Sequence, residues 1–134
     1  MIQAYFSQIK ATVDQCATTR FVLDANVSFE TRPGGQGYLT GSITFTDGSA
    51  LHFSEFLDAA KGTADKLMYT YHYQDAGHQL IFRYDNARHR PPLSSLEHKH
   101  APTQVVEAPA PRLEDVLDEI VVTNGWMQEN ATKP

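Results

Sequence analysis

The chain has 134 residues and a formal net charge of −5, with 41% hydrophobic and 20% charged residues. This size and balance predict a single soluble globular domain over residues 1–134. No apolar run approaches the roughly 20 residues that span a bilayer, and the N-terminus lacks the pattern of a secretory signal. The single cysteine, Cys16, excludes an internal disulfide framework, so we expect a cytoplasmic protein.

Apolar residues recur at three- and four-residue steps near both ends of the chain, a spacing typical of amphipathic helices. The N-terminal helix is expected over about residues 1–18, with Cys16 as a packed thiol. The C-terminal helix is expected to begin near Leu113 and to stop at Asn124-Gly125. We expect both helices to cover the same side of a sheet and the tail over 128–134 to be frayed.

Apolar and polar residues alternate in five segments between the helices, which predicts strands with one buried face. These segments are residues 21–30, 39–45, 51–57, 67–73 and 80–85. The fold class is therefore α+β: a single antiparallel meander sheet of about five strands, flanked by an N-terminal and a C-terminal helix. Prolines interrupt residues 86–111, which we expect to be a long ordered loop with a short strand at Gln104-Val105-Val106.

The hydrophobic pattern also predicts register at the Asp47-Gly48 turn. An odd-length loop there pairs Phe45 with Leu51 and keeps the apolar faces together, since a one-residue slip would invert every side chain. That register places Glu55 opposite Gly41, as a lone acid on an apolar face that needs a partner. The alternative is that the strand ends before Glu55, whose carboxylate is then solvated.

A second hairpin is predicted where residues 67–73 and 80–85 pair through an even-length loop. The expected register pairs Tyr71 with Phe82, because aromatic cross-strand pairs stabilise sheets. The opposite face then gathers Thr70, His72, Arg83 and Asp85. We expect that face to form the floor of a functional site.

Histidines are concentrated after this hairpin, where His89, His98 and His100 lie near Asp85 and Lys99 in the sequence. Three interpretations are open. The residues could bind a metal, although no recognised metalloenzyme spacing is present. They could cleave a phosphodiester without metal, because histidines transfer protons and Arg or Lys stabilises the charge on phosphorus. They could also hold the long loop in shape through hydrogen bonds, with no chemistry.

The same segment resembles the TumE family of small proteins associated with toxin–antitoxin modules. The strings that carry the resemblance are Tyr69-Thr70-Tyr71-His72-Tyr73, Leu80-Ile81-Phe82-Arg83-Tyr84-Asp85-Asn86-Ala87, His89, His98-Lys99-His100 and the acidic helix from Leu113 to Ile120. It covers about residues 40–121 and implies a toxin with a neighbouring DNA-binding antitoxin. Arg90 and Glu97 depart from the pattern, because histidines are common at both positions.

Our leading hypothesis is the toxin component of a type II toxin–antitoxin system that cleaves or binds RNA, as a metal-independent ribonuclease with no cofactor. The expected catalytic residues are His89, His98, His100 and Asp85, and the expected substrate-binding residues are Arg83, Lys99, Asn86, His72 and Tyr71. The expected partners are a cognate DNA-binding antitoxin and RNA, with no membrane, and a homodimer is one expected assembly. The alternatives are a non-catalytic protein-interaction module and a metal-dependent hydrolase.

Overall fold

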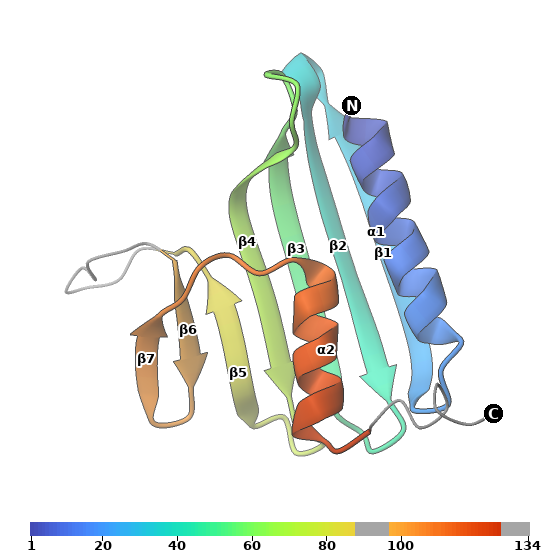
Figure 1. Ribbon diagram of the computed structural model, residues 1–134, viewed down its shortest axis with the longest axis vertical. Helices are drawn as coiled ribbons and strands as arrows, with labels where there is room; N and C mark the ends of the chain where they lie inside the picture. Colours follow the sequence, from blue (N-terminus) through green and yellow to red (C-terminus); the bar gives the residue numbers. More distant parts are fainter. Residues whose placement is uncertain (88–96, 127–134) are drawn as a thin grey trace.

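The computed structural model describes residues 1–87 and 97–126. Within these residues seven strands form one sheet in chain order, each antiparallel to its neighbour (Figure 1). The strands are β1 (Val22–Arg32), β2 (Gln36–Phe45), β3 (Ala50–Asp58), β4 (Asp65–Gln74), β5 (Leu80–Asp85), β6 (His98–Ala101) and β7 (Gln104–Glu107). The helices are α1 (Ile2–Ala17), the short 3-10 helix η1 (Pro33–Gly35) and α2 (Leu113–Thr123). None of the helices in the described ranges is long and apolar enough to cross a membrane.

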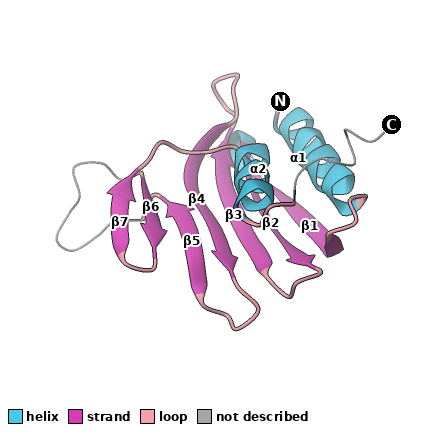
Figure 2. Ribbon diagram, turned by 60° about the horizontal axis from the view of Figure 1, so that its bottom comes forward, coloured by secondary structure: helices cyan, strands magenta, loops and turns pink. Residues whose placement is uncertain are grey.

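Both α-helices lie on the same face of the sheet, and no helix of the described residues covers the opposite face, which we call the open face (Figure 2). The predicted α+β class is confirmed, but the predicted number of about five strands was wrong. Two of the seven strands, β6 and β7, lie within residues 86–111, which we expected to be a loop. Each has four residues and β7 is exposed throughout, so neither shows a period-two hydrophobic pattern. The short strand predicted at Gln104-Val105-Val106 is confirmed as β7.

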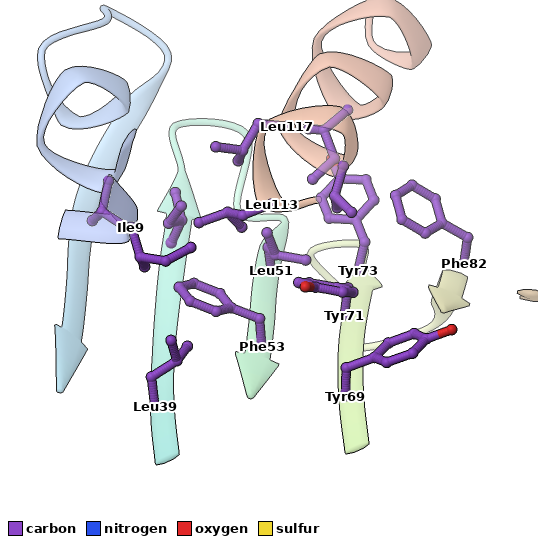
Figure 3. Packing of buried hydrophobic residues seen from close by; sticks show 14 of the residues in the cluster. Ile9, Leu39, Leu51, Phe53, Tyr69, Tyr71, Tyr73, Phe82, Leu113 and Leu117 are labelled. Carbon is purple, nitrogen blue, oxygen red and sulfur yellow. The ribbon is translucent and has the colours of Figure 1, made fainter. Parts of the chain in front are cut away.

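The core lies between the sheet and the two helices. Figure 3 shows Ile9 of α1 and Leu113 and Leu117 of α2 packed over the buried side chains of the central strands. Each large apolar side chain buried in this way contributes about 1.5–3 kcal/mol relative to exposure. Cys16 packs against the same core, and burial raises the pKa of its thiol to about 11, which fits the predicted packed thiol.

The β2–β3 hairpin keeps the predicted faces but shifts the predicted register by two residues. Gly41 faces Phe53, whose ring fills the space beside it, and Glu55 faces Leu39. The predicted pairing of Gly41 with Glu55 was therefore wrong. The loop is tighter than predicted because Gly48 adopts a φ of 89°, a conformation that favours glycine. A two-residue shift preserves the buried face, since side chains alternate with a period of two.

The β4–β5 hairpin shows the same kind of difference. Tyr71 pairs with Tyr84, and Tyr73 pairs with Phe82, where we expected Tyr71 opposite Phe82. A bulge between Tyr73 and Gln74 changes the register near the turn. The shift is again even, so the residues expected to share a face still do.

Glu55 is fully buried, because β3 continues past it to Asp58, and the solvated alternative is excluded. Its carboxylate accepts hydrogen bonds from Tyr5 of α1, at 2.5 Å, and from Tyr71 of β4. Lys66 lies 3.9 Å from the carboxylate and also donates to the carbonyl of Pro111 at 2.5 Å. This network ties α1 and the segment that precedes α2 to the sheet.

Candidate functional site

Polar side chains form straight rows across the open face of the sheet, because strand register aligns them. His52 pairs with His72, His72 with Arg83, and Arg83 with His100. We call these four residues the His–Arg row. It runs over β3, β4, β5 and β6, so four separate stretches of sequence contribute one side chain each.

A second row lies beside the first, two residues along each strand. Ser54 pairs with Thr70, Thr70 with Asp85, and Asp85 with His98. We call these four residues the Asp–His row. The predicted common face of Thr70, His72, Arg83 and Asp85 is confirmed by this register.

Asp85 is the centre where the two rows meet. Its Oδ1 lies 2.5 Å from Nε2 of His98, and its Oδ2 lies 2.9 Å from Nε of Arg83 and 3.5 Å from Nε2 of His100. The Asp85 side chain is 5% exposed and the His98 side chain is fully buried. A buried carboxylate is costly unless it is paired, and here imidazole and guanidinium groups surround it.

The side chains around Asp85 differ in their exposure to solvent. The side chain of Arg83 is 39% exposed and that of His100 is 12% exposed, and His72 is half-buried. These three can contact a ligand, whereas the side chains of Asp85 and His98 are almost completely buried. Burial and the Arg83 guanidinium lower the pKa of His72, and the nearby His52 also lowers it. His72 is therefore mostly neutral near pH 7 and suits a proton acceptor.

Asp85, His98 and His100 also form a candidate metal-ligand set, since one ligand atom from each lies within 4.8 Å of the others. Two imidazoles and a carboxylate suit zinc, manganese, iron or nickel. Two ligands at about 2.0–2.1 Å from a tetrahedral zinc lie roughly 3.3 Å apart. The 3.5 Å from Oδ2 of Asp85 to Nε2 of His100 is close to this value, whereas the 2.5 Å from Oδ1 of Asp85 to Nε2 of His98 is shorter.

Lys99 lies on the helix-covered face, away from Arg83. Its Nζ lies 2.6 Å from Oε2 of Glu119 on α2, and Tyr84 donates to Oε1 of the same carboxylate at 2.6 Å. On balance Glu119 and Tyr84 raise the pKa of Lys99, although burial opposes them. The structure thus separates two residues that we expected to hold phosphate together, because adjacent residues of a strand point to opposite faces.

The remaining predicted site residues have different places. Tyr71 is fully buried on the covered face, beside Glu55. Asn86 follows β5, where its amide donates to the carbonyl of Leu67 at 2.9 Å and accepts from the N–H of Tyr69 at 3.2 Å. His89 lies outside the described residues.

A polar groove of about 480 Å³ leads to the site along the open face. Its lining includes Ser42, His52, Thr70 and His72, so it ends beside Arg83 and Asp85 in the two rows. His52 was missed in the sequence because it precedes the other histidines. Its position between Leu51 and Phe53, which face the core, was the signal that it points to the open face.

Comparison with known proteins identifies the family. The sequence model of the family described as Toxin TumE matches residues 10–124, which include the second half of α1, the whole sheet and α2. Neither the curated proteins nor the solved structures contain a significant match. The match covers most of the chain and every residue of the His–Arg and Asp–His rows, and membership of a toxin family points to an antitoxin as partner. The chain therefore belongs to the TumE toxin family.

Proposed function

We propose that this toxin cleaves RNA on the open face of its sheet, without a metal ion. The observation that carries the proposal is the order His72, Arg83 and His100 along one row. A cation flanked by two imidazoles supplies the three groups that cleavage through the 2′-hydroxyl needs: a base, an acid and a positive charge for the phosphorus oxygens.

The spacing of the row suits this reaction. Neighbouring strands lie about 4.8 Å apart, so the backbones of His72 and His100 are about 10 Å apart with Arg83 between them. A phosphate held over Arg83 would have one imidazole on each side. In phosphoryl transfer the attacking and leaving oxygens lie roughly in line on opposite sides of phosphorus, which matches that placement.

His72 is the proposed base and His100 the proposed acid. His72 takes the proton of the 2′-hydroxyl as its oxygen bonds to phosphorus, and His100 donates a proton to the departing 5′-oxygen. The products are a 2′,3′-cyclic phosphate and a 5′-hydroxyl. Asp85, 3.5 Å from Nε2 of His100 and 2.9 Å from Nε of Arg83, orients both groups.

His98 is proposed as a positioning residue, because its side chain is fully buried beside Asp85 and its ring contacts that of His100. The rings of His98 and His100 are 4.8 Å apart and nearly perpendicular, so His98 also limits the rotation of His100. His89 stays a prediction from the sequence alone. We do not include Lys99 and Tyr71 in the proposed site, since both lie on the covered face.

RNA sequencing of cells that express the toxin from a tight promoter tests this proposal. We expect new 5′ ends with the parent chain and none with His72→Ala or His100→Ala. His78→Asn is the matched control, because His78 is exposed in the β4–β5 turn with a φ of 66°, which asparagine tolerates. New 5′ ends that persist in both alanine variants would overturn the assignment.

A second candidate is a metal-dependent hydrolase, favoured by the convergence of Asp85, His98 and His100 within 4.8 Å. Metal analysis of the purified protein separates the two functions. Stoichiometric zinc, manganese, iron or nickel that is lost in His98→Ala would favour the hydrolase. Metal-free protein that still cleaves RNA would favour the first candidate.

We further propose that the antitoxin partner is a DNA-binding protein encoded next to the toxin. A neighbouring reading frame with a helix-turn-helix would support this. Toxicity that survives every substitution in the His–Arg row, together with tight binding of a partner to the open face, would instead favour a non-catalytic interaction module.

A further inference from the structure

A third row on the open face is apolar, next to the polar rows described above. Tyr38 of β2 pairs with Phe56 of β3, and Phe56 pairs with Met68 of β4. We call these three residues the aromatic row. Met68 is 64% exposed, and three large apolar side chains that lie side by side make a contiguous apolar patch, the kind of surface that marks binding sites.

The aromatic row lines a pocket of about 430 Å³. Tyr38, Ser54 and Thr70 line both this pocket and the polar groove that reaches His72. The pocket and the groove are therefore continuous. A ligand that occupied both would contact aromatic rings at one end and hydroxyls and histidines at the other.

Arg32 lies over the rings of the aromatic row. Its Cζ is 5.5 Å from the centre of the Tyr38 ring and 5.7 Å from that of Phe56, within the range of a cation–π contact. Its side chain is 42% exposed and its Nε lies 3.3 Å from Oε2 of Glu30. The pocket thus combines flat apolar surfaces with a planar cation.

These groups match one class of occupant. An unpaired nucleobase has a flat face that stacks on aromatic rings or on a guanidinium, and it carries a phosphate that a cation attracts. An apolar peptide or a lipid chain would gain nothing from the row of hydroxyls and histidines that continues from the pocket. The occupant that suits both parts is single-stranded nucleic acid.

The distance along the strands is consistent with this. Phe56 follows His52 by four residues on β3, and a strand rises about 3.3 Å per residue, so the aromatic row lies about 13 Å from the His–Arg row. A base in the pocket would belong to a nucleotide a short distance along the chain from the phosphate at Arg83.

We propose that Tyr38, Phe56 and Met68, with Arg32, form a base-binding subsite for single-stranded RNA. The proposal rests on the proposed function in that it extends the same face, and it adds a determinant of substrate affinity outside the catalytic groups. The subsite binds by stacking, so it takes a base where a sugar-phosphate alone would not be held.

Binding of 2′-O-methyl hexanucleotides in EDTA tests the subsite without cleavage, because the 2′-oxygen cannot attack. Fluorescence polarisation would compare hexamers of uridine or adenosine with an abasic hexamer that has the same phosphates. We expect the hexamers with bases to bind at least ten-fold more tightly than the abasic one. Phe56→Leu should weaken their binding about ten-fold and leave abasic binding unchanged.

Val122→Ser is the matched control, since Val122 of α2 is 69% exposed on the covered side of the sheet, and Met68→Ser is its counterpart. Met68→Ser should weaken base-dependent binding, and Val122→Ser should not. The methyl resonance of Met68 gives a second readout in the parent chain, which needs no substitution. It should move upfield when a hexamer with bases is added, because a stacked base lies close to it.

Equal binding of abasic and base-containing hexamers, or an unmoved Met68 methyl resonance at saturation, would overturn the subsite. Failure of the proposed function looks different. Base-dependent binding at the aromatic row without cleavage of unmodified RNA would leave the subsite standing and remove the ribonuclease. Cleavage of RNA together with equal affinity for abasic and base-containing hexamers would support the ribonuclease and remove the subsite.

Discussion

Asp85 and His98 form a buried pair across β5 and β6, with Oδ1 and Nε2 2.5 Å apart. The pair links β5 to β6 and holds the buried part of the cluster that Arg83 and His100 complete. Oδ2 of the same carboxylate points to Arg83 and His100, which are partly exposed. One carboxylate therefore organises both a structural contact and the groups that a substrate would meet.

Asp85→Ala should destabilise the protein, because it leaves His98 and Arg83 without their carboxylate. Leaving buried hydrogen-bonding groups without their partner costs about 1–3 kcal/mol. Asp85→Asn keeps the shape and a hydrogen-bond acceptor, so we expect it to cost at least about 1 kcal/mol less. Urea unfolding measures both. An unfolding free energy of Asp85→Ala equal to that of the parent would show that the pair contributes nothing.

Arg83→Met and Lys99→Met form a matched pair, since the two residues are neighbours in the sheet but point to opposite faces. We expect Arg83→Met to abolish RNA cleavage. Lys99→Met should leave cleavage unchanged and lower stability by about 1 kcal/mol through loss of its contact with Glu119. Cleavage assays and thermal unfolding separate the effects. Equal loss of cleavage in both variants would contradict the assignment of the two faces.

His72 should titrate below its ordinary pKa of about 6.5. Burial and the Arg83 guanidinium are the causes, and both disfavour the charged ring. Histidine NMR titration would measure this pKa in the parent and in Arg83→Gln. Loss of the guanidinium charge should raise the pKa of His72 toward 6.5. An unchanged pKa in the variant would show that Arg83 does not act on His72.

The network around Glu55 predicts loss of stability in alkali. Burial and the Glu55 carboxylate raise the pKa of Tyr5 and of Tyr71 above 10. Each tyrosine therefore contributes stability that is intact below pH 10 and is lost as pH rises above it. Lys66 acts in the opposite direction. Burial lowers its pKa, so its contribution to stability increases as pH rises toward about 10.5. One lysine does not offset the loss from two tyrosines.

Unfolding free energies at pH 9 and pH 11 measure this loss. Each tyrosine should account for about 1 kcal/mol at pH 11, where its unfolded form ionises and its folded form does not. Tyr5→Phe should reduce the loss of unfolding free energy between pH 9 and pH 11 by the share of one tyrosine. A Tyr5→Phe variant with the same pH dependence as the parent would show that Tyr5 ionises freely in the fold.

Much of the fold could be predicted from hydrophobic periodicity. The two helices and the five longer strands have clear patterns, and the faces of both hairpins followed from alternation. Register could not be fixed in the same way, because shifts of two residues keep every face and depend on turn details such as the φ of Gly48. The strands β6 and β7 are too short and too polar to show a pattern.

The candidate site was predictable in part for the same reason. Alternation placed Thr70, His72, Arg83 and Asp85 on one face, and the structure adds His98 and His100 from β6. Recognising β6 as a strand would have shown that Lys99 points away from its neighbours. Alternation also placed His52 on that face, but His52 and the aromatic row were missed because they precede the histidine-rich segment, and only the strand register shows that they lie beside it.

Cleavage of a defined single-stranded RNA by the purified protein in EDTA tests the central claim most directly. We expect products with a 2′,3′-cyclic phosphate and a 5′-hydroxyl, formed by the parent and by His78→Asn. The rate should fall about 10²–10⁴-fold in His72→Ala and in His100→Ala. Products that form at the parent's rate in both alanine variants, or no cleavage by the parent, would contradict a catalytic His–Arg row.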